Sequence, residues 1–252
     1  MTDSRWPYDL IDLSRPLTLK TVHALFGNLV ANGDNAYFTD FKLEVASDFD
    51  TAPAYSLVVR VPEHMGTHMD APIHTVPGAG KLETVDLRSL IGEAVVLDLD
   101  RGGIDHGFSA AEIAEAAAKV EGGGIHKGDI VLIYSGFQDA TIDTQMRQTW
   151  LTGEAAQWLV DAGAVAVGFE PATPDPFRLG LYEYGWGDKD TPNQPAWPAH
   201  MTLLGNNVLI IEGLTHLDRI KGRRVRFAAL PPNIPGGSGF PVRAVAWLDQ
   251  PR

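Results

Sequence analysis

The sequence predicts a mixed, sheet-dominated α/β fold in a single domain spanning residues 1–252. Nine apolar runs rich in β-branched residues are bounded by Gly, Pro or Asp, which is typical of strands, whereas two segments have helical periodicity. The 26 glycines and 17 prolines make up about a sixth of the 252 residues and favour many turns over long helices. No repeat, linker or break in composition divides the chain, so we expect one domain.

The predicted strands are short apolar segments with a turn signal at each end, as strands of a compact sheet require. In chain order they are Tyr8–Leu13, Phe41–Val45, Ser56–Val61, Ala94–Leu99, Ile130–Tyr134, Ala164–Phe169, Val208–Ile211, Val225–Ala229 and Val242–Trp247.

The two predicted helices have recognisable ends. The first, Ser109–Val120, opens with a Ser and a Glu three residues later, the pattern of a capping box, and glycines follow it. The second begins after Thr152 and ends at Gly163, and its apolar residues fall on one face. These helices are expected to cover part of the sheet.

Composition excludes several classes of function. The 32 acidic residues outnumber the 20 Lys and Arg, so the net charge of −12 would repel nucleic acid. No apolar run approaches the roughly 18 residues of a membrane span, and the N-terminus lacks the features of a signal peptide. We therefore expect a soluble, cytoplasmic protein. Because cysteine is absent, any chemistry must rest on His, carboxylates, hydroxyls or a bound cofactor.

Three histidines and an aspartate fall within eleven residues, at His64, His68, Asp70 and His74. All four positions are even, so an extended strand would place them on one face. A straight strand would nevertheless hold His64 and His68 about 13 Å apart, too far for two ligands at ~2.1 Å from one ion. The spacing therefore predicts a turn between them, either a bend at Gly66 or a single helical turn.

Pro72 shapes the end of this motif. It disfavours helical geometry at the residue before it, so we expect an extended stretch after Asp70 that directs His74 separately from the other three side chains.

Two imidazoles and a carboxylate with open positions are typical of a catalytic divalent metal. Such ligands suit Zn²⁺ first, with Mn²⁺ and Fe²⁺ as alternatives. A further carboxylate, Glu212, follows the apolar run Val208–Ile211, which predicts a position at the carboxyl end of a strand, where sites on open sheets are built.

The run His-x-Gly-Thr-His-x-Asp-x-Pro-x-His resembles the signature of the cyclase family, which includes bacterial kynurenine formamidases, isatin hydrolases and related metal-dependent amide and lactone hydrolases. The resemblance extends over nearly the whole chain and implies the swivelling β/β/α fold of that family. Its other landmarks are Ile11–Ser14, Gly128–Ile133, Val167–Glu170, His200 and Glu212–Leu214.

The resemblance also implies roles for individual residues. It assigns His64, His68 and Asp70 as metal ligands, with Asp70 able to bridge two ions, and His74 as proton donor and acceptor. It implies that His200 contributes to a second metal and that Glu212, twelve residues on, binds both, so the site would hold one or two ions. A homo-oligomer, dimer or tetramer, is also implied.

The chain departs from the kynurenine formamidase pattern in three regions. The segment Thr18–Gly27, which includes His23, replaces the Trp-Pro-Gly-Asp loop, and Glu170 replaces the Asp of the Val-Gly-Ile-Asp strand. The connection 176–199 is long and is a candidate lid. Its aromatic residues could stack on a flat substrate or anchor the loop or a subunit contact; they are Tyr182, Tyr184, Trp186 and Trp197.

The sequence therefore predicts a metal-dependent hydrolase that cleaves a C–N bond of a small amide, imide or lactam, with a small-molecule substrate and neither nucleic-acid nor membrane partners. A lactone hydrolase and a metal-assisted cyclase or dehydratase are alternatives, because the same Lewis acid serves each. A protein of a different class, which keeps the metal site but only binds a small molecule, is the third alternative.

Overall fold

The computed structural model describes residues 8–18, 41–100, 105–137, 148–176 and 197–249, and the statements below refer to these residues. Their main element is a nine-stranded sheet with strand order β1-β13-β11-β5-β7-β9-β10-β4-β12. Its strands are β1 (Tyr8–Asp12), β4 (His68–Asp70), β5 (Ile91–Asp98), β7 (Ile130–Tyr134), β9 (Ala166–Phe169), β10 (Leu209–Glu212), β11 (Arg224–Ala228), β12 (Gly239–Pro241) and β13 (Val245–Asp249).

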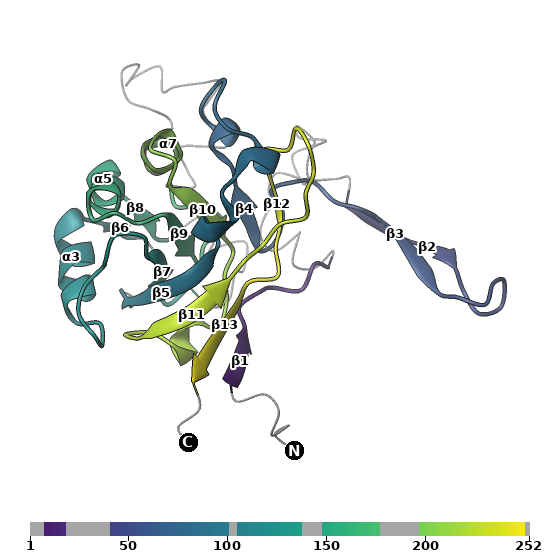
Figure 1. Ribbon diagram of the computed structural model, residues 1–252, viewed down its shortest axis with the longest axis horizontal. Coiled ribbons are helices and arrows are strands. Elements are labelled where there is room, and N and C mark those ends of the chain that lie inside the picture. Colours follow the sequence, from purple (N-terminus) through teal and green to yellow (C-terminus); the bar gives the residue numbers. More distant parts are fainter. Residues whose placement is uncertain (1–7, 19–40, 101–104, 138–147, 177–196, 250–252) are drawn as a thin grey trace.

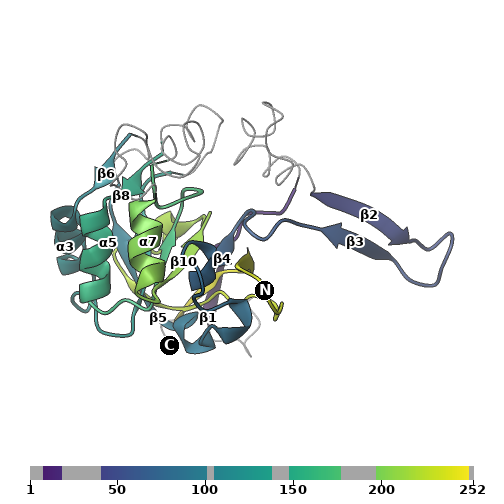
Figure 2. The same cartoon turned by 90° about the horizontal axis from the view of Figure 1, so that it is seen from above.

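The centre of the sheet is parallel and buried on both faces. Strands β5, β7, β9 and β10 run parallel, and the outer strands join them antiparallel. Helices α3 (Ala110–Ala118), α5 (Gly153–Asp161) and α7 (Pro198–Gly205) lie side by side on one face (Figures 1 and 2). Buried apolar side chains between these helices and the sheet form one core, which includes Val95, Ile133 and Leu159.

A second core fills the other face, where the sheet curls. It joins side chains of the central strands, such as Val96 and Leu132, to Phe227 of β11 and Met69 of β4. Leu82 of the 3₁₀ helix η2 (Leu82–Thr84) and Leu217 of η4 (Leu217–Arg219) belong to this core. The other two 3₁₀ helices in the described ranges are η1 (Pro72–His74) and η3 (Leu87–Ser89). Strand β4, which carries His68 and Asp70 of the histidine motif, lies near one edge of the sheet, between β10 and β12.

Two small sheets complete the described structure. Strands β6 (Gly107–Phe108) and β8 (Trp150–Leu151) form a short parallel pair. Strands β2 (Lys42–Ser47) and β3 (Ser56–Arg60) form an antiparallel hairpin, called the arm below, that projects away from the main sheet (Figures 1 and 2).

The predicted sheet-dominated α/β class is confirmed, and each of the nine predicted runs contains or overlaps a strand. The last run is displaced, because β13 begins at Val245 and not at Val242. Strands β4, β6, β8 and β12 were not predicted, because two or three residues are too few to show an alternating pattern.

The two predicted helices are confirmed with their caps. Ser109 and Glu112 form the capping box of α3, and the Thr152 side chain accepts a hydrogen bond from Ala155 N–H at the start of α5. Helix α7 was not predicted. Its buried side chains include a histidine, His200, so it lacks the apolar stripe that identifies an amphipathic helix.

None of the helices in the described ranges has both the length and the apolar character that crossing a membrane requires. His23 and residues 177–196 of the predicted lid lie outside the described residues.

Candidate metal centre

Strand β4 presents His68 and Asp70 on the same face, because side chains alternate along a strand, and sends Met69 into the core behind. Its antiparallel neighbour β10 pairs Glu212 directly opposite His68. Residues opposite each other in a sheet share a face. The register therefore places one imidazole and two carboxylates together, and confirms that Glu212 ends a strand.

The predicted bend occurs at Gly66, whose φ is +66°. This left-handed conformation favours glycine, and a Cβ there would also lie 2.6 Å from Leu17 Cδ2. Gly213, directly after β10, also has a left-handed φ of +68°, and a Cβ on it would lie 2.5 Å from the Gly66 oxygen. Two glycines thus allow the His68 segment and the end of β10 to touch through their backbones.

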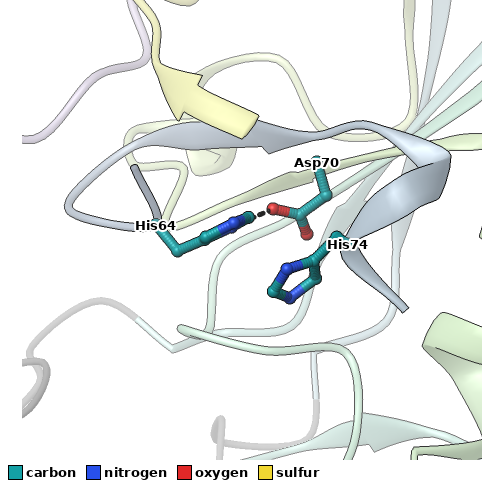
Figure 3. Close-up of side chains that lie close together, drawn as sticks. All are labelled: His64, Asp70 and His74. Carbon is teal, nitrogen blue, oxygen red and sulfur yellow. Dashed lines mark hydrogen bonds and ion pairs between the residues drawn. The ribbon is translucent and has the colours of Figure 1, made fainter. Parts of the chain in front are cut away.

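The bend returns His64 to the cluster. Its Nδ1 lies 2.6 Å from Asp70 Oδ1, the contact drawn in Figure 3. On the other side of the ring, Nε2 lies 2.8 Å from Ser238 Oγ, and that hydroxyl donates to Glu63 Oε2. Ser238 and Glu63 therefore fix the orientation of the His64 ring.

The position expected for His74 was wrong. Ala71 is extended as predicted, but Pro72 begins the 3₁₀ turn η1, in which His74 N–H donates to Ala71 O. Proline suits the first position of a helical turn because it has no N–H to leave unpaired. The turn carries His74 back onto His64, and the two rings stack with centroids 3.8 Å apart (Figure 3).

Helix α7 supplies His200. Its Nε2 lies 3.3 Å from Glu212 Oε1 and 3.6 Å from Asp70 Oδ2. Its Nδ1–H donates to Asp175 Oδ2 at 2.7 Å, and the same carboxylate accepts the N–H groups of Ala199 and His200 at the start of the helix. Asp175 therefore orients both the ring and the helix that carries it.

Sequence reasoning missed Asp175, Ser238 and Glu63. Each acts through a partner far away in the chain: Asp175 lies 25 residues from His200, and Ser238 lies 174 residues from His64. A single sequence has no signal for such pairs, because no fixed spacing connects them.

The cluster is almost fully buried, with exposed fractions of 0 to 8% for His64, His68, Asp70, His200 and Glu212. Even so, His68 Nε2, Asp70 Oδ2 and Glu212 Oε1 have no hydrogen-bond partner. An unpaired buried polar group costs about 1–3 kcal/mol, and more if it is charged. These atoms are therefore expected to have a ligand in common.

Distances within the cluster fit a metal ion. His68 Nε2 lies 3.4 Å from Asp70 Oδ1 and 3.2 Å from Glu212 Oε2. Two ligands at ~2.1 Å from an ion in tetrahedral geometry are about 3.4 Å apart. The His68 Nδ1 atom lies 3.1 Å from the Gly66 carbonyl, which sets the tautomer in which Nε2 has its lone pair available.

Electrostatics also favour a cation here. Burial opposes the charge of His68, but Asp70 and Glu212 outweigh it and raise the pKa of His68 to about 9. Burial likewise opposes the charge of His200, but Asp175, Asp70 and Glu212 raise its pKa well above the usual value. Burial favours the neutral form of Asp70, yet the surrounding imidazoles hold its pKa well below the usual range. The two carboxylates thus demand about two positive charges, which a divalent ion can supply.

The ligand atoms form two groups that share Asp70. One contains His68, Asp70 and Glu212, and the other contains His64, Asp70 and His74; in each, the atoms lie within 4.8 Å of one another. These groups contain five of the six side chains that the sequence singled out, and the sixth, His200, lies 3.6 Å from Asp70 and 3.3 Å from Glu212. The arrangement fits a divalent metal ion.

Two other residues named from the sequence lie apart from these groups. Glu170 accepts hydrogen bonds from Ser135 N–H, the Ser135 hydroxyl and Phe137 N–H, so it holds the segment after β7. Trp197 is the one lid aromatic within the described residues, and its ring centroid lies 6.1 Å from that of His74 and 5.4 Å from that of His200. It forms a wall beside the cluster.

This chain is similar to known proteins over most of its length. The chain matches the family model described as "Putative cyclase" over residues 11–176. An isatin hydrolase of Roseibium aggregatum is 28% identical over 201 residues, which cover 73% of this chain and 71% of the relative. A kynurenine formamidase of Salinibacter ruber is 28% identical over 192 residues, 74% of this chain and 77% of the relative.

Solved structures share the fold. A crystal structure of an isatin hydrolase bound to the product analogue thioisatinate aligns with a TM-score of 0.79 at 22% identity, over 96% of this chain and 93% of the other. Isatin hydrolase A from Ralstonia solanacearum aligns with a TM-score of 0.75 at 24% identity, over 96% and 92%. Because the family model spans well over half of the chain, including the whole histidine motif, the chain belongs to the cyclase family.

Proposed function

We propose that this protein is a metal-dependent hydrolase that cleaves a C–N bond of a small amide, imide or lactam. The observation that carries the proposal is the set of buried ligand atoms without hydrogen-bond partners, His68 Nε2, Asp70 Oδ2 and Glu212 Oε1. The names of the relatives, isatin hydrolase and kynurenine formamidase, support this reaction class.

The proposed ligands are His64, His68, Asp70, His200 and Glu212, and the ion is Zn²⁺ first, with Mn²⁺ and Fe²⁺ as alternatives. A divalent ion held there supplies a Lewis acid that lowers the pKa of water and polarises a carbonyl group. Asp175, Ser238 and Glu63 support the site by holding His200 and His64 in the orientation that turns the ligand nitrogen of each ring inwards.

We assign His74 the proton transfers. It is only half-buried, unlike the five ligands, so it borders the space from which a substrate would approach. A neutral imidazole offers one donor and one acceptor nitrogen. It can therefore take a proton from water and deliver one to the leaving nitrogen. Trp197, beside His74, provides a flat apolar wall against which a planar substrate can lie.

Elemental analysis of the purified protein, followed by a substrate panel, tests this proposal. We expect one or two equivalents of divalent metal per chain, and turnover of at least one member among cyclic imides, isatin-like lactams and N-formyl anilines. A lactone should be assayed beside its lactam analogue. If the protein turns over only the lactone, the proposed reaction becomes ester hydrolysis in place of amide hydrolysis. A metal-loaded protein inactive on both would favour the binding-protein alternative.

We also propose that the protein works as a homo-oligomer, a dimer or a tetramer. The family resemblance supports this assembly.

A further inference from the structure

Three candidate ligand histidines each direct one ring nitrogen to the carboxylates of the centre and the other nitrogen to a hydrogen-bond partner outside it. In His68 and His200 the inner atom is Nε2, because the Nδ1 atoms meet the Gly66 carbonyl and the Asp175 carboxylate. Those partners only accept hydrogen bonds. In the neutral ring each Nδ1 therefore carries the proton, and each Nε2 has the available lone pair.

His64 is turned the other way. Its Nδ1 lies 2.6 Å from Asp70 Oδ1, as Figure 3 shows, and its Nε2 lies 2.8 Å from Ser238 Oγ. The backbone of β12 permits this position, because a Cβ on Gly239 would lie 2.7 Å from His64 Cε1. The ring of His74 stacks on that of His64 at a centroid distance of 3.8 Å. Packing therefore holds the ring with Nδ1 as the inner atom.

The outer partner of His64 differs from the other two, because a hydroxyl group can both donate and accept a hydrogen bond. A serine beside a histidine therefore permits either tautomer. The hydroxyl oxygen accepts from Nε2–H, or the hydroxyl donates to Nε2 and the ring proton stays on Nδ1. In the second case no lone pair of His64 would face the centre, so the direction of the Ser238 hydroxyl decides whether this ring can bind a metal ion.

Glu63 sets that direction. Its Oε2 lies 2.5 Å from Ser238 Oγ, a distance typical of a hydroxyl that donates to a carboxylate, and it also accepts the Ser238 N–H at 3.0 Å. A carboxylate has no hydrogen to donate, so the single hydroxyl hydrogen of Ser238 goes to Glu63. Ser238 Oγ can then only accept from His64. The ring proton is thereby fixed on Nε2, and the Nδ1 lone pair faces Asp70.

Two further distances define how Glu63 acts. Its Oε2 lies 3.9 Å from His64 Nε2, beyond hydrogen-bond distance, so it acts on the ring through the hydroxyl of Ser238. A neighbouring carboxylate shows what holding the loop requires: Glu83 Oε2 accepts the N–H of Gly236 at 2.9 Å, a contact with the backbone. Holding the loop needs only such an N–H, whereas Glu63 takes the hydroxyl hydrogen as well.

We propose that Glu63 is a positioning residue that fixes the tautomer of His64 through the hydroxyl of Ser238, an arrangement called the relay below. His64 then binds the metal ion through Nδ1, whereas His68 and His200 bind through Nε2. This inference rests on the proposed metal-dependent function and deepens it, because it names the ligand atom of each ring. A partner on the second nitrogen of a ligand histidine fixes the tautomer and the ring orientation, and its loss lowers metal affinity about 10- to 100-fold.

NMR spectroscopy of the zinc-loaded protein with ¹⁵N-labelled histidine reads the ligand atom directly. In a long-range ¹H–¹⁵N spectrum Nε2 couples to both carbon-bound ring protons, whereas Nδ1 couples strongly to only one of them. The two nitrogens of a ring are thereby told apart, and a directly bonded hydrogen marks the protonated one. His64→Gln identifies the His64 signals by their loss. We expect the parent protein to have His64 Nδ1 bound to zinc and Nε2 protonated.

Zinc affinity, measured by competition with a chelator, separates the relay from a purely structural role of the loop. Ser238→Ala removes the hydroxyl acceptor, and Glu63→Gln introduces an amide that can donate to the hydroxyl oxygen. We expect each to lower zinc affinity about 10- to 100-fold and to give a second set of His64 signals with Nε2 bound to zinc, since nothing then selects the position of the ring proton. Ser238→Thr retains the hydroxyl, so its affinity should stay within about threefold of the parent value.

Two matched controls remove the same kinds of group elsewhere. Glu83→Gln removes a carboxylate that holds the same loop, and Ser14→Ala removes a half-buried hydroxyl that bonds to the backbone of Ala244. Both should keep the parental zinc affinity and a single set of His64 signals. Equal affinities of Ser238→Ala and Ser14→Ala, or zinc bound to His64 Nε2 in the parent, would overturn the relay and leave the metal-dependent function standing. A parent protein that takes up no divalent metal would overturn both.

Discussion

The metal centre and the arm are opposite exceptions to the rule that polar groups face water and apolar groups avoid it. In the centre, His68, Asp70 and Glu212 are 4% exposed or less, although three of their ligand atoms have no hydrogen-bond partner. In the arm, apolar side chains such as Val45 and Val59 are more than half exposed. Both arrangements are unfavourable in an isolated chain. Each exception therefore indicates a missing binding partner. The unpaired polar atoms of the centre require a cation, and the exposed apolar face of the arm requires an apolar surface.

The strongest test of the centre is the carboxylate that both ligand groups share. Asp70→Asn keeps the volume of the side chain but removes its charge, so we expect metal content to fall to background and turnover to be lost. Asp86→Asn, at an exposed position, is the matched control and should leave both unchanged. If inductively coupled plasma mass spectrometry finds parental metal content in Asp70→Asn, the ligand assignment is wrong.

His74 separates catalysis from metal binding. His74→Ala should retain at least one metal equivalent, bound by the His68 group, while kcat falls about 10²- to 10⁴-fold, the usual contribution of a proton-transfer residue. His126→Ala, on the surface, provides the control. Unchanged turnover would remove His74 from the mechanism.

Glu170 is a buried carboxyl group whose pKa, unlike those of Asp70 and Glu212, is not lowered mainly by histidines. Burial raises its pKa to about 7, against the hydrogen bonds from Ser135 and Phe137. Because the folded state then binds the proton more tightly than the unfolded state, this stabilisation is complete below about pH 4.5 and is lost as the pH rises through about 7. Between pH 5 and pH 8 the loss should be on the order of 2–3 kcal/mol.

Urea unfolding of metal-free protein at both pH values, compared with Glu170→Gln, measures this contribution. The free energy of unfolding of the Gln variant should rise relative to that of the parent by about that amount between pH 5 and pH 8. A difference between the two proteins that does not change with pH would show that Glu170 is ionised at both.

Asp175 should have the smallest effect, because it acts through His200. Asp175→Asn retains an acceptor for the helix N–H groups but weakens the hold on the His200 ring, so metal affinity should fall about 10- to 100-fold. Competition with a chelator measures the dissociation constant, and Asp161→Asn at an exposed position serves as the control. Parental affinity in Asp175→Asn would exclude the positioning role.

The sequence was informative where the signal is local. Apolar runs such as Ile130–Tyr134 predicted the buried strands, and the Ser109 capping box predicted the start of a helix. The spacing of His64, His68 and Asp70 required a bend, which the structure confirms at Gly66. The family and the hydrolase class followed from the same motif, and both agree with the relatives found. The individual site roles remain predictions.

The rest depends on contacts between distant segments. The residues near His200 in the sequence do not predict its contact with the Asp175 carboxylate. They also do not predict helix α7, because this helix is stabilised by its buried packing and has no apolar stripe. The position of His74 depends on a single 3₁₀ turn, which a proline can begin as readily as it can extend a strand. The arm shows a related limit, since its strands were predicted but their exposure was not.

The backbone contact between Gly66 and Gly213 has a consequence for how this site can change. A methyl group at position 213 would clash with the Gly66 carbonyl, which lies between His64 and His68 in the chain. It would therefore push the segment that carries these histidines away from Glu212. The spacing of the ligands is thus limited by two positions that carry no side chain at all. A variant could replace residues around the substrate with little disturbance, whereas Gly213→Ala would alter the dimensions of the cation cavity itself.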